Sequence, residues 1–337
     1  MTVFIRIFIC FFMATQISHA RDEKPFYADK QIKMIIGVPP GGGYDIYARL
    51  LARHMGAYLP GKPLIISQQM PGAESLVATN YLYNVAPRDG TVIGSVVNGI
   101  LFEPLLSGKG NVNYDIMKFS WIGNLNKEVN LLTVWHTVPV NSFQDIQKRE
   151  TILAATVGGS GTSNTFPKIL NEMLGAKIKV ISGYSSSAQG FLAMQRGEVE
   201  GRGMYWSSLI AAQRDLYERG EIKILLQTGL EKHPDLPNVP FALDLARNKD
   251  DRALMELLFS SLTLGRPIFA PPDIPAQRFR ELRAAFDLAV KDENFQADAA
   301  RMKIEANSSS GSEVEHVLRQ VYATPPDIIK RARDIMN

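Results

Sequence analysis

Residues 31–58 read QIKMIIGVPPGGGYDIYARLLARHMGAY, and this stretch decides the fold class. Residues Ile32–Val38 are mostly apolar, as in a buried strand. A loop of Pro and Gly follows, and Asp45 then opens a helix. Along that helix a stripe recurs at three- and four-residue steps, formed by Tyr47, Leu50, Leu51, His54, Met55 and Tyr58. The stretch therefore predicts a strand, a tight loop and an amphipathic helix.

After this stretch the same alternation of strand and helix continues through most of the chain. Further strands are predicted at residues 64–68, 92–98, 131–136, 152–157, 178–182 and 222–228. Helices are predicted at residues 74–85, 164–174, 188–196, 206–219, 276–291, 312–324 and 327–336. This order predicts mostly parallel sheets covered by helices on both faces. A chain of 337 residues has room for two such domains, since one domain takes about 100–200 residues.

The N-terminus has the three-part pattern of a secretory signal. Arg6 is the only charged residue before position 21, the apolar run Ile7–Ala14 follows it, and Ser18-His19-Ala20 offers small residues at a cleavage site. The run is shorter than the ~20 residues that span a bilayer, so cleavage after Ala20 is favoured over the alternative of a membrane anchor. Cys10 lies inside the run, where a lipid-modified cysteine does not belong. The mature chain therefore contains no cysteine and no disulfide.

Composition and motif spacing exclude several classes of protein. The net charge is +3, and Lys and Arg do not cluster with aromatic residues, so no nucleic-acid partner is predicted. His54, His136, His233 and His316 are far apart in sequence, so no metal and no cofactor is predicted. The first loop lacks the phosphate-binding fingerprints, and Gly-Gly-Ser160-Gly-Thr misses the nucleophile-elbow motif by its last residue. No catalytic motif is found, although an enzyme on a similar fold stays an alternative.

Three loops rich in Gly or Ser each lie between a predicted strand and a predicted helix. Such loops lie at the carboxyl ends of strands, where α/β proteins bind ligands. The following helix adds free N–H groups and a partial positive charge, which favour an anion. The alternative is that Gly and Ser only make turns and helix caps; three equivalent loops favour binding. The loops are residues 39–45, 158–164 and 183–188.

Six segments in order resemble the receptors of tripartite tricarboxylate transporters, also called the Bug family of periplasmic receptors. Together they cover nearly all of the chain after the signal. They are Pro40–Arg49, Pro71–Ala73, Pro87–Thr91, Gly159–Ser163, Leu236–Pro240 and Phe269–Pro275.

The resemblance implies an α/β fold of the type II periplasmic-binding class, with two Rossmann-like lobes joined by crossing strands. Its expected limits are residues 1–20 for the signal peptide, 21–125 with 225–337 for lobe 1, and 126–224 for lobe 2. We expect the lobes to close on ligand about residues 126–134 and 222–228. The implied function is that of a periplasmic monomer that captures a small mono-, di- or aromatic carboxylate and delivers it to the permease subunits of a transporter. The same receptor serving a signalling system is the alternative.

The resemblance also implies which residues line the cleft, where backbone amides, hydroxyls and water hold the carboxylate rather than an arginine. The expected ligand contacts are Pro40, Gly41, Gly42, Gly43, Tyr44, Asp45, Gly72, Ala73, Ser75, Asn98, Ser160, Gly161, Thr162, Ser163, Tyr184, Ser185, Ser186 and Tyr205. Asp45 has two interpretations, as the N-cap of its helix or as a ligand contact, and the N-cap is favoured because Asp commonly starts helices.

This chain departs from the family pattern at residues that bear on the ligand. Ser182–Ser186 replaces a Pro-Tyr-x-Gly segment, and Tyr44, Tyr205 and Trp206 add aromatic bulk that either shapes a larger cleft or fills the core. Arg202 has two interpretations as well, as a partner for an acid's distal charge or as a structural arginine.

Overall fold

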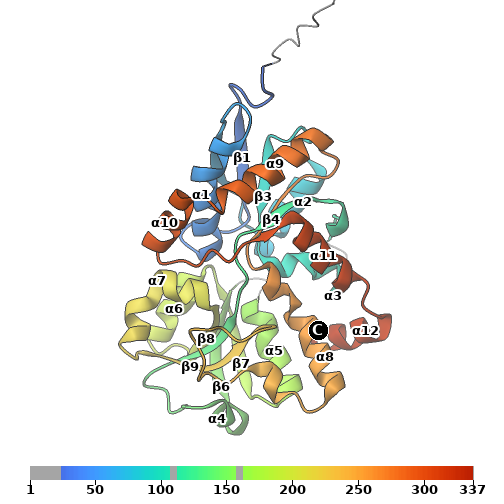
Figure 1. Cartoon of the computed structure of the whole chain (residues 1–337). Helices are drawn as coiled ribbons and strands as arrows, with labels where there is room; N and C mark the ends of the chain where they lie inside the picture. The colour runs from blue at the N-terminus through green and yellow to red at the C-terminus, as the bar shows by residue number, and fades with distance from the viewer. Residues whose placement is uncertain (1–23, 107–111, 157–161, 337) are drawn as a thin grey trace, which may run out of the picture.

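The computed structural model describes residues 24–106, 112–156 and 162–336, which form two lobes, each built on a mixed β-sheet (Figure 1). In the six-stranded sheet β1 pairs in parallel with β2 and β3, whereas β10 runs antiparallel to β3 and β4. The strand order is β11 (Ser309–Ser310), β4 (Ser120–Asn124), β10 (Pro267–Ala270), β3 (Val92–Ser95), β1 (Gln31–Ile36) and β2 (Leu64–Gln69).

Helices from both ends of the chain cover this first sheet. The stripe predicted on the first helix is real, because Tyr47, Leu50 and Leu51 are buried in one core with Phe286. The helices of this lobe are α1 (Gly43–His54), α2 (Leu76–Asn84), α3 (Glu103–Leu106), α9 (Ala276–Ala289), α10 (Glu293–Arg301) and α11 (Gly311–Tyr322).

The second lobe holds the five-stranded sheet. Its β6 is parallel to β7 and β8, and β5 lies antiparallel between β8 and β9. The strand order is β7 (Ile178–Tyr184), β6 (Thr151–Thr156), β8 (Gly201–Tyr205), β5 (Asn130–Trp135) and β9 (Ile222–Thr228). Its helices are α4 (Phe143–Lys148), α5 (Thr162–Leu174), α6 (Ser187–Gln195), α7 (Trp206–Glu218) and α8 (Lys249–Phe259).

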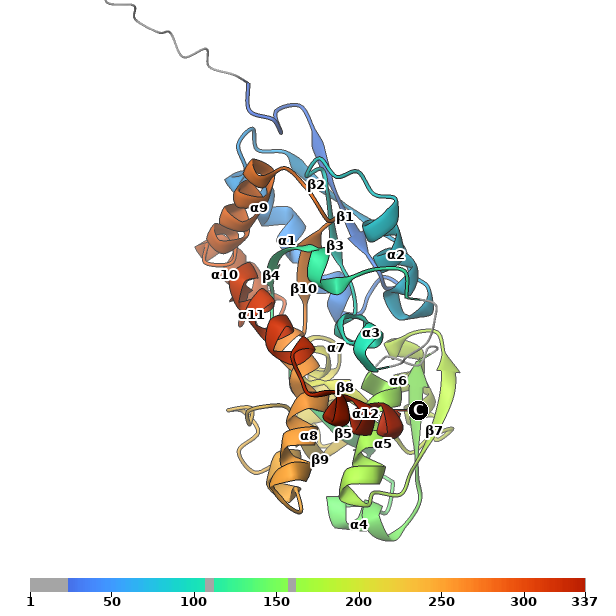
Figure 2. The same cartoon turned by 90° about the vertical axis from the view of Figure 1, so that its right-hand side faces the viewer.

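Two neighbouring segments carry the chain between the sheets. The outward crossing joins β4 to β5, and the return crossing runs from α8 through the 3-10 turn Ser260–Leu264 to β10. The two segments are bonded to each other, since the Leu125 N–H donates to Arg266 O at 2.9 Å and the Glu128 N–H donates to Leu262 O at 2.8 Å. A third crossing brings α12 (Pro326–Met336) back onto α5 and α8 of the second lobe (Figure 2).

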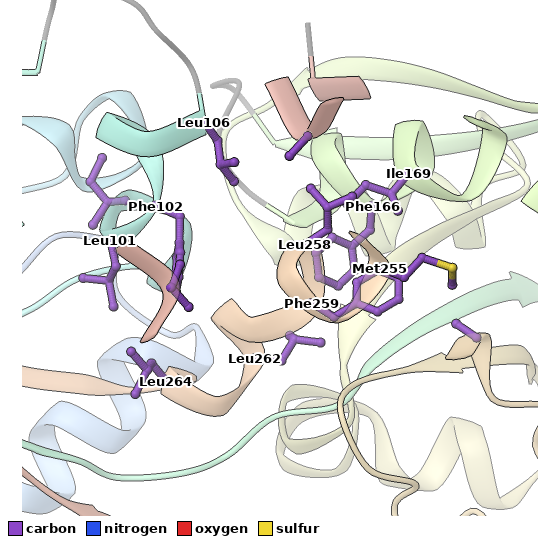
Figure 3. Close-up of a cluster of buried hydrophobic side chains, with 14 of the residues drawn as sticks. Leu101, Phe102, Leu106, Phe166, Ile169, Met255, Leu258, Phe259, Leu262 and Leu264 are labelled. Carbon is purple, nitrogen blue, oxygen red and sulfur yellow. The ribbon is translucent and has the colours of Figure 1, made fainter. Parts of the chain in front are cut away.

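Apolar side chains from both lobes meet beside these crossings. Figure 3 shows Leu101, Phe102 and Leu106 of the first lobe next to Leu262 and Leu264 of the return crossing, with residues of α5 and α8 beyond them. All belong to one buried cluster. Burial of apolar surface at about 25 cal/mol per Å² therefore stabilises the junction as well as each lobe.

The two-lobed α/β fold agrees with the sequence-based expectation, but three details differ. Both sheets are mixed, because β4, β5, β9, β10 and β11 run antiparallel to a neighbour. The expected change of lobe at residue 225 falls inside β9, which pairs with β5 along its length. The return crossing expected at residues 222–228 instead lies at residues 260–266, because β9 is an edge strand of the second sheet.

Candidate functional site

The first Gly-rich loop leads into α1 with its backbone partly open. Gly41 has a φ of +88°, which favours glycine, and a Cβ added at Gly41 or Gly42 would meet nothing within 4 Å. Pro40 is exposed. Gly43 is different, because a Cβ there would lie 2.8 Å from Arg266 Nη2 and from Ser208 Oγ of α7. The loop is therefore open at Gly41 and Gly42 and closed against the second lobe at Gly43.

Asp45 is not the N-cap of α1, contrary to the favoured interpretation. The N-cap is Gly42, and Asp45 lies in the first turn, 4% exposed. Its Oδ2 accepts the Gly41 N–H at 3.0 Å, and its Oδ1 accepts Arg49 Nε at 2.8 Å and Gln69 Nε2 at 2.5 Å. The carboxylate thus bonds back to the loop and across to β2, so it fixes the loop without capping the helix.

The loop before α2 has an uncommon backbone. Gly72 has a φ of +146°, and Ala73, Glu74 and Ser75 follow with φ of +42°, +49° and +72°. Non-glycine residues in this region cost about 1–3 kcal/mol each and occur where the surrounding structure holds them. Ser75 shows how it is held: its buried Oγ donates to Gly37 O at 3.0 Å and accepts the Val97 N–H at 3.1 Å.

This left-handed turn directs Glu74 to the other lobe. Glu74 Oε1 accepts the hydroxyl of Thr156, the last residue of β6, at 2.9 Å. Thr156 Oγ1 also lies 3.2 Å from Ser163 Oγ in the first turn of α5. A carboxylate of one lobe therefore accepts a hydroxyl of the other, and a second hydroxyl lies next to the first. Sequence reasoning named Gly72, Ala73 and Ser75 but missed Glu74, although an acid inside a loop expected to bind an anion is a signal.

The two tyrosines expected at the cleft meet in a buried polar cluster between the lobes. Tyr44 and Tyr205 both donate their hydroxyls to Asn98 Oδ1, at 3.0 and 2.8 Å. Asn98 Nδ2 donates to Ser261 O on the return crossing at 2.8 Å. Burial raises the pKa of both phenols, and a side-chain hydrogen bond with Thr162 opposes the shift at Tyr205. The structure therefore brings Tyr44, Asn98, Thr162 and Tyr205 together, with the tyrosines packed rather than exposed.

Arg266 completes this cluster from the return crossing. Its guanidinium lies over the rings of Tyr44 and Tyr205, 4.2 and 4.9 Å from the centroids, and pairs with Glu128 Oε1 at 3.0 Å. Desolvation opposes the charged form of Arg266, but Glu128 and the neighbouring phenols outweigh it and raise its pKa. Each partner's side chain is 1% exposed, so this is a fully buried ion pair at the junction of the lobes.

The loop between β7 and α6 is open on its outer side. Ser186 is the N-cap of α6 and accepts the Gln189 N–H at 3.3 Å, while the Ser185 N–H donates to Gln189 Oε1 at 3.0 Å. Ser185 is exposed and Tyr184 is half-buried. The expected contacts Ser160 and Gly161 lie outside the described residues, whereas Thr162 and Ser163 begin α5.

A separate pocket of about 460 Å³ lies between α7 and the segment that follows α10, and none of the expected ligand contacts lines it. Its wall mixes charges of both signs with apolar groups. The lining residues are Trp206, Ile210, Arg214, Glu218, Asp235, Ala300, Lys303, Ile304 and Glu305.

At the edge of this pocket His233, Asp235 and Glu305 bring possible metal-ligand atoms within 4.8 Å of one another. His233 Nε2 lies 3.0 Å from Glu305 Oε1, and Trp206 Nε1 donates to the same oxygen at 3.1 Å. His233 and Glu305 are thus already bonded to each other, and Asp235 lies beside them. The spacing of histidines did not predict this cluster, because Glu305 comes from a distant part of the chain.

Among the described residues, no helix is long and apolar enough to cross a membrane.

Comparisons with known proteins give one family and a consistent fold. The profile described as "Tripartite tricarboxylate transporter family receptor" matches residues 47–333. No curated protein matches the chain in sequence. The periplasmic binding protein BugD is similar in structure, with a TM-score of 0.72 and 19% identity over 92% of this chain and 98% of BugD.

Two further similar structures were solved with a carboxylate, adipate in one and malate in the other. An R. palustris protein with adipate has a TM-score of 0.69 and 19% identity, over 90% of this chain and 97% of its own. MatC from Rhodopseudomonas palustris with bound malate has a TM-score of 0.67 and 18% identity, over 91% of this chain and 99% of its own. These likenesses confirm the two-lobed fold of periplasmic binding proteins.

Proposed function

Because the chain belongs to the receptor family of tripartite tricarboxylate transporters, we propose that it captures a small organic carboxylate between its lobes and catalyses no reaction. The observation that carries the proposal is the contact of Glu74 with Thr156 and, beyond it, Ser163. In this contact a hydroxyl of the second lobe already donates to a carboxylate oxygen of the first lobe, and a second hydroxyl lies beside it. The adipate and malate in two relatives of the same fold support carboxylates as ligands.

The remaining parts of the proposal concern where the protein works. We propose that residues 1–20 are a cleaved export signal, that the receptor acts as a periplasmic monomer, and that it delivers its ligand to the permease subunits of the transporter. Gly41 and Gly42 of the first lobe, with Thr156, Thr162 and Ser163 of the second, are the proposed ligand contacts. They are open or hydroxyl-bearing and lie on facing lobes.

A thermal-shift screen of the chain from Arg21 onward tests this function. Adipate, malate and a set of mono- and dicarboxylates are the probes, and hexanediol is the uncharged control. A ligand at 100 times its Kd adds ~2.7 kcal/mol of stability, which is readily measured. No shift with any acid contradicts the proposed ligand class. Chemical conversion of a bound acid, followed by mass spectrometry, contradicts the absence of catalysis.

A variant ties the binding to the proposed site. Thr156→Val removes the hydroxyl at the end of β6 with little change in shape, and we expect it to weaken binding of the acid found in the screen about tenfold. Thr137→Val is the matched control, since Thr137 is exposed in the turn after β5. Equal binding by wild type and Thr156→Val rules out this position as a contact.

A further inference from the structure

Among the described residues Arg202, Arg266 and Arg278 are buried, and Arg278 pairs with Glu281 Oε1 at 2.9 Å. Arg266 pairs with Glu128. Arg202 on β8 is 4% exposed, and within the described part of the chain it forms no ion pair with any carboxylate. Its guanidinium instead donates to two backbone carbonyl oxygens, that of Ser187 and that of Gly203, the latter at 3.3 Å.

Carbonyl groups satisfy these hydrogen bonds but leave the charge of Arg202 uncompensated. Burying a charge without a partner is costly, and buried charges are normally paired. Desolvation lowers the pKa of Arg202 to about 10, and no acidic group offsets this shift. Since about 10 is well above neutral pH, the side chain stays protonated. A buried, charged guanidinium without a carboxylate partner has the chemistry to bind an anion.

The position of Arg202 connects it with the proposed ligand contacts. Arg202 is paired with Ala154 of β6, and Thr156 lies two residues farther along that strand, which is about 7 Å. The Nη1 atom of Arg202 reaches the first residue of α6, Ser187, which is exposed. On the same helix a Cβ at Gly190 would lie 3.6 Å from Nη1, so this helix approaches the guanidinium closely.

The start of α6 adds a second feature that favours an anion. The helix has nine residues, and its first N–H groups carry the partial positive charge of a helix N-terminus. Ser185, Ser187 and Ala188 around this end are exposed, so it is accessible from outside the lobe. Arg202 is thus a buried cation directed at an accessible helix start.

We propose that Arg202 and the first turn of α6 bind a second carboxylate of the ligand, while its first carboxylate binds the Thr156 and Ser163 hydroxyls. This inference rests on the proposed function and deepens it. The receptor then selects acids with two carboxylates, and Arg202 determines that selectivity by charge.

The test compares matched acids on matched variants. Adipate and hexanoate have equal chain length and differ in one carboxylate, and succinate and butanoate form a shorter pair. Binding is measured by calorimetry on wild type, Arg202→Met, Arg202→Lys and Arg196→Met. Arg196, exposed just after α6, is the control because its removal changes the net charge of the same lobe equally.

We expect wild type and Arg196→Met to bind one diacid at least tenfold more tightly than its monoacid. Arg202→Met should remove this preference and leave monoacid affinity within about twofold, while Arg202→Lys keeps part of it. A folded Arg202→Met protein that keeps the full diacid preference overturns the inference. So does an equal loss of diacid and monoacid binding, which indicates a structural arginine. If wild type binds no acid, the proposed function itself fails, an outcome distinct from these.

Discussion

At the scale of single residues, Asp45 holds the first loop by accepting hydrogen bonds from Gly41, Arg49 and Gln69. Asn offers one acceptor oxygen, so Asp45→Asn must turn its amide group toward one of these donors. We expect this change to lower the free energy of unfolding by about 1–3 kcal/mol, the cost of leaving a buried polar group unsatisfied. Urea denaturation measures it, and Asp215→Asn on the exposed side of α7 is the control. Unchanged stability of Asp45→Asn contradicts the role assigned here.

The residues of the site were predictable only where one loop contains the signal. The Gly-rich sequence predicts an open loop, and in the structure the backbone is open at Gly41 and Gly42. Whether Tyr44 and Tyr205 face a ligand or each other depends on Asn98, to which both donate from different elements. The position of Glu74 depends on the left-handed turn of its own loop and on its hydrogen bond with Thr156, which is far away in the sequence. Such contacts depend on the tertiary fold, which no local pattern contains.

At the scale of elements, α11 begins with a reciprocal capping box. Ser310 Oγ accepts the Glu313 N–H at 3.3 Å, and Glu313 Oε2 accepts the Ser310 N–H at 2.7 Å. The backbone hydrogen bond from Ser310, together with that from its side chain, lowers the pKa of Glu313 below the ordinary 4.5. A lowered pKa means that the ionised carboxylate stabilises the fold above about pH 4.5 and loses this effect as the pH falls through the folded-state value.

A pair of Glu→Gln changes tests the charge at this helix end. Glu313→Gln should lower the free energy of unfolding by about 0.3–1 kcal/mol at pH 7, as expected for a charge at a helix N-terminus. The difference from wild type should shrink as the pH falls through the folded-state pKa of Glu313. Glu172→Gln, in the last turn of α5, is the control and should not destabilise, because a negative charge is unfavourable at that end. A pH-independent loss in Glu313→Gln refutes the electrostatic explanation.

Elements were predictable where periodicity extends over several turns or a full strand. The sequence predicted α1, α5, α7, α9, α11 and α12 within a few residues of their ends. It missed β4 and β10, of five and four residues, because Gly123 and Pro267 interrupt their apolar pattern. These two strands receive their β-structure from antiparallel pairing with each other, which brings together residues that are far apart in the sequence.

At the scale of the whole molecule, the buried pair of Glu128 and Arg266 joins the outward and return crossings. Removing one partner leaves an uncompensated buried charge. Glu128→Leu and Arg266→Met should therefore each cost about 3–5 kcal/mol of unfolding free energy. The double variant Glu128→Leu/Arg266→Met should cost much less than the sum of the two single changes, and urea denaturation of all four proteins measures the difference. Additive effects contradict a coupled pair.

The sequence predicted an outward crossing at residues 126–134, and the chain passes between β4 and β5 at residues 125–129. The prediction placed the return crossing too early, because nothing local distinguishes β9, an edge strand of the second sheet, from a strand that leaves it. The true return passes through the Ser260–Leu264 turn, whose partners Glu128 and Asn98 lie far back in the chain. The point at which the chain returns to the first lobe thus depends on strand pairing and not on the periodicity of apolar residues in the sequence.

The contact between Glu74 and Thr156 has a consequence for binding equilibria. For an acid that uses Thr156, Glu74 is a competitor tethered to the receptor, and its effective concentration is on the order of millimolar for a short connection. Because Glu74 is part of the receptor, dilution does not remove it, and every acid that uses Thr156 has to displace it. A weakly held anion fails to displace it, whereas one with additional contacts succeeds. The apparent affinity of every such acid is then lower than its intrinsic affinity by the same factor, so only acids with additional contacts bind at low concentration.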